Sequence, residues 1–371
     1  MKLAIIRRRY TPYGGAERFI ERISNELRLH DVNTTIVAER WNAPTEHEPK
    51  LLEVRTSGLS RASRFQSFAK AIQSVISEHK FDIVQSHERL LGADIYRLGD
   101  GVHQAWINRL SRQGSRWLGM RYKYDPFHTA VLSMERKMAA DPRLRYVANS
   151  ELVSEEIQDI LQVPAERITL IPNGVNTQYF SPPTPEDRRA ERIKSGLPKD
   201  AFVVGFVGSG FERKGLFQLI KSLQFLPDTF LLCCGKDREH GRLINDIASS
   251  DISKRVFYLG AVTDVKPLLW SSDVFALPSL YDPSSNAVLE ALSCGLPVTT
   301  TKDVGTANKI VSTESGIICT RDPESIAEKI NFFKDATRRT IYASNARALA
   351  KQFDQERVMK EWLFFYNKFF L

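Results

Sequence analysis

Short apolar runs alternate with segments of helical periodicity along the whole chain, and this alternation limits the possible folds more than any other feature. The predicted strands of the first half are Leu3–Ile6, Thr34–Ala38, Leu51–Arg55, Phe81–Gln85, Ile95–Leu98, Tyr146–Asn149 and Thr169–Ile171. Those of the second half are Phe202–Val207, Phe230–Cys234, Val256–Leu259, Val274–Leu277 and Pro297–Thr300. Parallel neighbours need a long, usually helical, crossover, so this order predicts parallel sheets wound with helices.

A polar stretch that opens with Ser181–Pro185 separates the two series, and 371 residues exceed a usual single core. We therefore expect two doubly wound α/β domains, over residues 1–180 and 181–352, and a terminal helix over residues 353–371 that packs back toward the first. Ligands of such sheets bind beyond the carboxyl ends of the strands. The loops that follow the predicted strands are the places to look for chemistry.

The most specific loop is 281–292, which follows the strand Val274–Leu277. Ser284, Ser285 or Asn286 can cap a helix whose first N–H groups point at a ligand, and Asp282 and Glu290 bracket the cap. Two such carboxylates can hold hydroxyl groups on either side of a bound diphosphate. An ordinary capped surface helix would have the same residues.

A second loop, Gly208–Gly215, follows the strand Phe202–Val207 and ends in adjacent cations, Arg213 and Lys214. Small residues allow a close turn, and a guanidinium beside an ammonium can neutralise the charge of a leaving diphosphate. The loop lacks the Ser or Thr that follows Lys in the Walker pattern. A solvated turn is the alternative.

Two weaker signals lie in the first half. Gly14 and Gly15 stand between the first strand and the first helix, where glycines allow a ligand close to the backbone, although a tight turn needs them equally. Asp100 lies between two glycines at the end of the strand Ile95–Leu98, and His103 follows it. An aspartate in such a position is often only a turn former.

Taken together, these blocks resemble the GT-B glycosyltransferases of family 4, and the resemblance runs over nearly the whole chain. Gly14-Gly15, the loop Gly208–Gly215 and the segment Asp282–Val298 carry it, the last being similar to the family's E-x7-E motif. Within the family, Gly14-Gly15 followed by Ala16-Glu17-Arg18 looks similar to the lipopolysaccharide-core hexosyltransferases. The resemblance implies two Rossmann-like domains that face each other across a cleft, the first on the acceptor side and the second binding a nucleotide sugar.

The resemblance also implies a role for each site residue. Arg213 and Lys214 would be catalytic by stabilising the leaving nucleotide, together with Asp100 and Asp282, which would contact sugars; Asp282 stands where the family usually has Glu. The donor would be bound by Gly14, Gly15, Gly208, Ser285, Asn286, Ala287 and Glu290, with Glu290 on the ribose. Glu17, Arg18 and His103 would lie on the acceptor side. The implied reaction is transfer of a hexose or N-acetylhexosamine, expected to be UDP-linked, with retention at the anomeric carbon.

The net charge of +8 indicates an anionic partner. Segment 103–124 contains Arg109, Arg112 and Arg116, two tryptophans and no acid, which suits an anionic membrane surface or single-stranded nucleic acid. A glycolipid acceptor favours the membrane, so we expect no nucleic acid. The alternatives are a transferase for capsule, teichoic acid or a soluble acceptor, and more remotely a nucleic-acid-binding protein.

The sequence contains no Asp-x-Asp metal motif, so we expect an enzyme that needs neither metal nor cofactor. No apolar stretch approaches the ~18–20 residues needed to cross a bilayer, and the start of the chain does not fit a signal peptide. Cys233, Cys234, Cys294 and Cys319 have no metal or redox spacing, which indicates buried reduced thiols. We therefore expect a cytoplasmic enzyme, peripheral on the inner face of the membrane.

Overall fold

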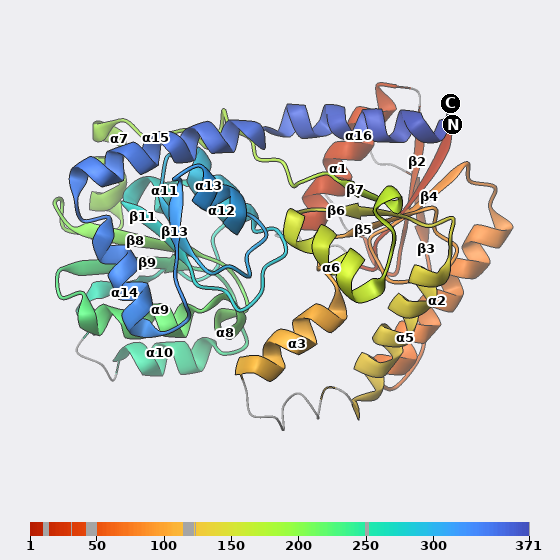
Figure 1. Ribbon diagram of the computed structural model, residues 1–371, viewed down its shortest axis with the longest axis horizontal. Helices are drawn as coiled ribbons and strands as arrows, with labels where there is room; N and C mark the ends of the chain where they lie inside the picture. Colours follow the sequence, from red (N-terminus) through yellow and green to blue (C-terminus); the bar gives the residue numbers. More distant parts are fainter. Residues whose placement is uncertain are drawn as a thin grey trace. The chain divides into compact units, whose positions relative to one another are not determined.

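The computed structural model describes residues 1–9, 15–30, 32–41, 50–113, 122, 124–248 and 252–370. The chain forms two compact units (Figure 1). The first combines Met1–Pro172 with Met359–Leu371, and the second is Asn173–Val358. Each unit is an α/β domain with one sheet.

The sheet of the first unit is wholly parallel, in the order β3-β2-β1-β4-β5-β6-β7. Its strands are β1 Lys2–Ile6, β2 Asn33–Ala38, β3 Lys50–Glu53, β4 Ile83–Ser86, β5 Ile95–Leu98, β6 Arg145–Ala148 and β7 Ile168–Leu170. Leu3 of β1 is in register with Thr34 on one side and Ile83 on the other. The direction of winding therefore reverses between β1 and β4, which is where doubly wound sheets bind ligands.

Several helices of the first unit begin at side-chain caps. The helices of this unit are α1 Gly15–Arg28, α2 Arg61–Glu78, α3 His103–Gln113, α5 Pro126–Ala140 and α6 Glu151–Leu161. Ser60 and Ser63 form a capping box at α2, and the Asp125 carboxylate accepts from two backbone N–H groups at α5. These side chains satisfy donors that the first helical turn leaves without partners.

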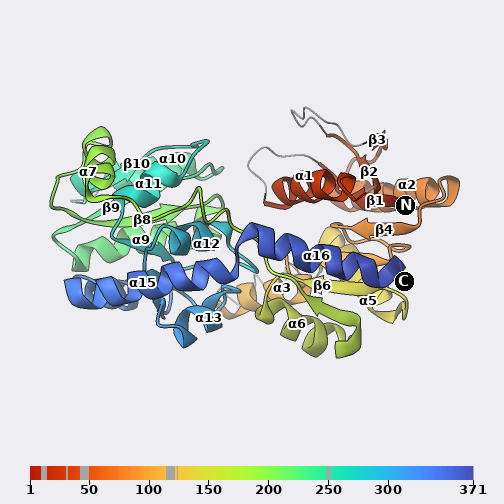
Figure 2. The same ribbon diagram turned by 90° about the horizontal axis from the view of Figure 1, so that it is seen from above.

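The terminal helix α16, Gln355–Phe370, lies beside elements of the first unit over most of its length (Figure 2). Trp362 is fully buried, with its ring centroid 5.0 Å from that of Phe19 in α1. The Tyr366 hydroxyl donates to Gln85 Oε1 at 2.6 Å, at the end of β4. Aromatic packing and this buried hydrogen bond attach the end of the chain to the first sheet.

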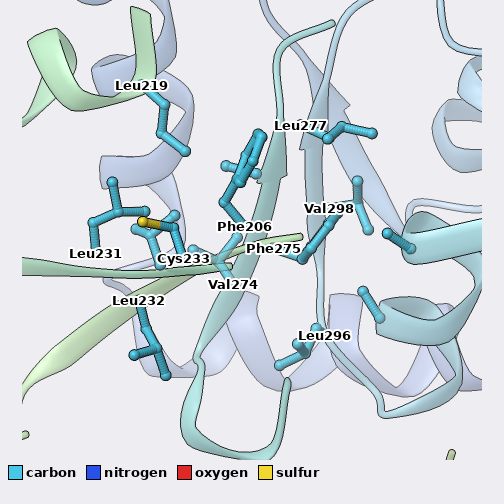
Figure 3. Packing of buried hydrophobic residues seen from close by; sticks show 14 of the residues in the cluster. Phe206, Leu219, Leu231, Leu232, Cys233, Val274, Phe275, Leu277, Leu296 and Val298 are labelled. Carbon is cyan, nitrogen blue, oxygen red and sulfur yellow. The ribbon is translucent and has the colours of Figure 1, made fainter. Parts of the chain in front are cut away.

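The second unit repeats the architecture with the strand order β10-β9-β8-β11-β12-β13. Its strands are β8 Phe202–Val207, β9 Thr229–Cys234, β10 Val256–Tyr258, β11 Val274–Leu277, β12 Val298–Thr300 and β13 Gly316–Ile318. Buried apolar side chains, including Phe206 and Phe275, pack from the strands against the surrounding helices (Figure 3). The winding reverses between β8 and β11, which pair directly.

The helices of the second unit precede, connect and follow these strands. They are α7 Pro185–Lys194, α8 Phe211–Lys214, α9 Leu216–Ser222, α10 His240–Ala248, α11 Lys266–Ser271, α12 Asn286–Ser293, α13 Ala307–Ser312, α14 Pro323–Phe332 and α15 Ala336–Gln352. Thr184 and Asp187 form a capping box at α7, so part of the predicted polar stretch is a capped helix.

The structure confirms two doubly wound α/β domains. Every predicted strand is present, with ends shifted by no more than two residues. The sequence analysis missed β13, Gly316–Ile318, which begins with a glycine, a residue that is depleted in strands. The four cysteines are free and buried, as predicted. Within the described residues, no helix has the length and apolar character needed to span a membrane.

Candidate functional site

Two of the predicted loops meet at the point where the winding of the second sheet reverses. Val204 of β8 pairs with Val274 of β11, so the loops that follow these strands leave the sheet side by side. Lys214, from the loop after β8, places Nζ 3.2 Å from Oδ2 of Asp282, from the loop after β11. Both side chains are largely buried, at 14% and 10% exposed. The structure thus joins the cation of one motif to the carboxylate of the other.

Backbone contacts hold the same two loops together. The N–H of Leu280 donates to the carbonyl of Arg213 at 2.7 Å, and Nη1 of Arg213 donates to the carbonyl of Tyr281 at 2.8 Å. A Cβ at Gly208 would collide with the Lys214 side chain, and one at Gly215, where φ is +81°, would collide with the Pro278 carbonyl. Glycine at these two positions is what lets the loops approach so closely.

The helix α12 begins at the end of the second loop with Ser285 as its N-cap. Ser285 is 2% exposed, and its Oγ has no hydrogen-bond partner among the described residues. Asn286 and Ala287 follow in the first turn, whose backbone N–H groups have no acceptor within the helix. Glu290 lies one turn further on and is 7% exposed. The helix start therefore combines free donors with a buried hydroxyl, an arrangement that suits an anion.

The sequence analysis missed three residues that shape this region. Arg321 donates to carbonyls of both loops, those of Pro278 and Glu212. The Asp237 carboxylate accepts from the N–H of Phe211 at 2.7 Å, and Asn173 Nδ2 donates to Asn286 Oδ1 at 2.8 Å.

Each of the three comes from a distant part of the chain, so no local pattern marks it. Burial opposes ionisation of Asp237, but hydrogen bonds from backbone N–H groups, among them that of Glu239, hold the pKa of Asp237 below its usual value. A charged Asp237 therefore anchors the start of α8.

The remaining predicted site residues belong to the first unit. Gly15 begins α1, and Glu17 and Arg18 lie in its first turns, but the positions of those two side chains are outside the described part. Gly14 is outside the described residues as well. Helix α1 is the element that follows β1 in the chain, and β1 lies at the reversal point of the first sheet.

Asp100 is exposed in the loop after β5. Glu88 follows β4, and desolvation raises the pKa of its carboxyl group. The positive charge of Arg7 lowers this pKa, and the negative charge of Asp100 raises it. Arg7 Nη1 lies 3.3 Å from Glu88 Oε1. Asp100 and Glu88 thus form a pair of interacting acids near the carboxyl ends of neighbouring strands, and the sequence analysis had identified only the first.

His103 lies at the start of α3 and is engaged within the unit. Its Nε2 is 2.8 Å from Nδ1 of His128, and the two rings stack with centroids 5.0 Å apart. Desolvation, followed by the charges of Arg89 and others, lowers the pKa of His103 to about 3. His103 is therefore neutral at physiological pH, with one ring nitrogen already occupied by its neighbour.

One arginine of the basic segment 103–124, which was predicted to contact an anionic membrane surface, is paired inside the first unit. Arg109 Nη1 lies 2.8 Å from Oε1 of the buried Glu156, so this cation serves an ion pair within the unit. Trp106 stacks on His103 and His128 in an aromatic cluster. Arg112 is exposed. Residues 114–121 and 123, with Arg116 and the second tryptophan, lie outside the described residues.

In the described part of the chain, no group of three or more His, Cys, Asp or Glu side chains is arranged to hold a metal ion.

Comparison with known proteins establishes the class that this fold and site define. Residues 13–179 match the family model described as Glycosyltransferase Family 4, and residues 187–349 match the one described as Glycosyl transferases group 1. The two ranges together take in most of the chain; the first contains β2 to β7 and the second contains β8 to β13. The chain belongs to the GT-B glycosyltransferases, and it is a transferase enzyme.

Among relatives, the chain is 24% identical over 354 residues to lipopolysaccharide glucosyltransferase WaaG of Escherichia coli (strain K12), covering 92% of each protein. It is 25% identical over 358 residues to the lipopolysaccharide core biosynthesis glycosyltransferase LpsE of Rhizobium meliloti (strain 1021), covering 94% of this chain and 95% of LpsE. The predicted resemblance to lipopolysaccharide-core transferases is confirmed.

Solved structures agree on the fold. A crystal structure of WaaG superposes with a TM-score of 0.82 at 22% identity and covers 97% of this chain and 98% of its own. The structure of Anabaena HepE in complex with UDP-glucose superposes with a TM-score of 0.74 at 21% identity, and the match covers 99% of this chain and 100% of the HepE chain.

Proposed function

We propose that this enzyme transfers a hexose from a UDP-sugar to a glycolipid acceptor of the lipopolysaccharide-core type, with retention at the anomeric carbon. The names of the two relatives support the acceptor class, since both act in lipopolysaccharide biosynthesis. HepE, a protein of similar fold, binds UDP-glucose, which supports the donor class.

One observation carries the proposal: Lys214, Arg213 and Asp282 converge at the reversal point of the second sheet. A diphosphate bound there would gain two cationic contacts. As the bond from the sugar to the diphosphate breaks, negative charge grows on the leaving oxygen, and Lys214 and Arg213 stabilise it. Asp282 would orient the Lys214 ammonium and contact the donor sugar.

The start of α12 supplies the rest of the donor site. The free N–H groups of Asn286 and Ala287 and the unpartnered Ser285 hydroxyl would bind phosphate oxygens. Glu290, buried one turn along the helix, would accept from ribose hydroxyls. Ionic, backbone and hydroxyl contacts together would fix the position of the anomeric carbon.

The acceptor would approach from the side of the leaving group, and positioning with charge stabilisation would supply most of the rate. Gly14 and Gly15 would admit the donor close to the first unit, and Asp100 would contact the transferred sugar or the acceptor. Glu17, Arg18 and His103 would serve the acceptor side. The neutral state of His103 suits a hydrogen-bonding role better than an ionic one.

We further propose that the reaction needs no metal and takes place at the cytoplasmic face of the membrane. The two cations of the loop would replace a metal in neutralising the diphosphate. Segment 103–124, with exposed Arg112, would contact anionic lipid near the acceptor.

A donor screen tests the proposal. The purified enzyme is incubated with UDP-, GDP- and ADP-hexoses, with and without a truncated lipopolysaccharide core, and release of the nucleotide is measured. We expect acceptor-stimulated release from a UDP-hexose. Activity on GDP- or ADP-sugars alone would contradict the donor, and full activity on a soluble acceptor with none on the glycolipid would point to a capsule or small-molecule transferase. Salt-sensitive oligonucleotide binding without any turnover would overturn the whole assignment.

A further inference from the structure

A cavity of about 660 Å³ lies in the first unit, at the amino ends of its strands. The starts of β1 and β2, strand β3, the end of α1 and the turn after α2 line it. The N label in Figure 1 marks this end of β1. The loop that carries Gly15 leaves the opposite, carboxyl end of the same strand, so the cavity is separate from the predicted acceptor side of the unit. Its volume is within the range of small-molecule sites.

The described residues that line the cavity include four cationic side chains and no acidic one. The cations are Lys2, Arg28, Lys50 and Lys80. They come from four separate elements, β1, α1, β3 and the turn after α2, so no local charge run accounts for them. Cations converging from separate elements on one cavity create a positive potential that attracts an anion.

Hydroxyl groups without partners add a second, independent observation. Ser24 of α1 is 6% exposed, and its Oγ has no hydrogen-bond partner among the described residues. Oγ1 of Thr34, in β2, is buried and has no partner in the described part of the chain either. Both residues line the cavity. Buried polar atoms without partners are uncommon in native proteins, and a ligand that enters the cavity would satisfy these two.

We propose that this cavity is a second ligand site, which binds a phosphate ester that also carries hydroxyl groups. The cations hold the phosphate, and Ser24 and Thr34 bind oxygens of the organic part. A Lys or Arg paired with phosphate makes a charge-assisted hydrogen bond, which is stronger than a neutral one. A free sugar phosphate and a phospholipid headgroup share this chemistry.

Calorimetry with glucose 6-phosphate and co-sedimentation with phosphatidylcholine vesicles that contain phosphatidylglycerol distinguish the two sources. Whichever of these two ligands binds, the double variant Arg28→Gln with Lys80→Gln should bind it about tenfold or more weakly, since two charge-assisted contacts are lost. Ser24→Ala should weaken binding about threefold or more while leaving the thermal unfolding temperature unchanged or raised, because it removes an unpartnered buried hydroxyl.

The exposed pair Lys70 and Lys137, which do not line the cavity, provides the matched control: Lys70→Gln with Lys137→Gln makes the same change of charge on the same unit. Binding should survive in this control and in Lys214→Met. Loss in Lys214→Met but not in the Arg28/Lys80 variant would place the ligand at the donor site and overturn the proposal. So would equal loss in the Lys70/Lys137 control, or no binding in either experiment.

Discussion

Replacing Lys214 with Met removes the ammonium while keeping the length of the side chain. Two consequences follow from the 3.2 Å ion pair with Asp282, whose side chain is only 10% exposed. The carboxylate is left without its cation in a largely buried place, and breaking such a pair costs about 3 kcal/mol of the free energy of unfolding. The diphosphate also loses a contact that strengthens in the transition state, which lowers turnover about 100-fold or more.

The double variant, Lys214→Met with Asp282→Asn, separates these consequences. With neither charge present, no uncompensated carboxylate is buried, and we expect the free energy of unfolding to return to within about 1 kcal/mol of the wild type. Turnover should stay at least about 100-fold below the wild type, because the leaving group still lacks its cation.

Urea unfolding and nucleotide release from the donor sugar measure both quantities on the same preparations. Arg188→Met is the control in the same unit: Arg188 Nη1 also lies 3.2 Å from a carboxylate oxygen of Asp273, and that carboxylate keeps Arg192 Nη2 at 2.7 Å. This control should lose less stability than Lys214→Met and keep its turnover. Near-normal turnover in Lys214→Met, or recovery of turnover in the double variant, would refute the role of Lys214 as a contact to the leaving group.

Three further outcomes follow. Turnover should persist in EDTA, because Arg213 and Lys214 supply the positive charge; loss in EDTA restored by Mg²⁺ or Mn²⁺ would contradict this. Arg112→Ser with Arg116→Ser should weaken the binding of the protein to anionic vesicles by roughly 2 kcal/mol at low salt, because each cation contributes about 1 kcal/mol. The loss should be smaller at high salt, which screens the charges. Equal co-sedimentation of variant and wild type would exclude membrane contact through these arginines. Arg109 is left unchanged because it pairs with Glu156. Desolvation, aided by Arg89, lowers the pKa of His103 to about 3. Between about pH 3 and 6.5 the unfolded chain therefore binds a proton at this histidine that the native chain does not bind. The free energy of unfolding consequently rises with pH over this range. His103→Gln should reduce the increase of the unfolding free energy with pH, by no more than about 1.4 kcal/mol per pH unit, as measured by urea unfolding at pH 5 and pH 7. An unchanged pH dependence would show that other groups produce this increase.

The sequence by itself determined the two parallel sheets, because buried strands in such sheets are continuous apolar runs that a linear pattern reveals. It also marked the two loops of the proposed donor site, since glycine turns, adjacent cations and a capped helix are local features. The edge strand β13 was missed because it begins with a glycine, which weakens the local strand signal.

Only the tertiary structure decided which of these features meet. Lys214 and Asp282 are far apart in sequence, and they form an ion pair because β8 and β11 are neighbours at the reversal of the sheet. The partner of Arg109, Glu156, comes from α6, so this arginine of the basic segment forms an ion pair within the first unit. The cavity at the amino ends of the first sheet gathers its cations from four separate elements. Contacts between distant segments depend on how the strands are ordered, and a local pattern of residues does not contain that order.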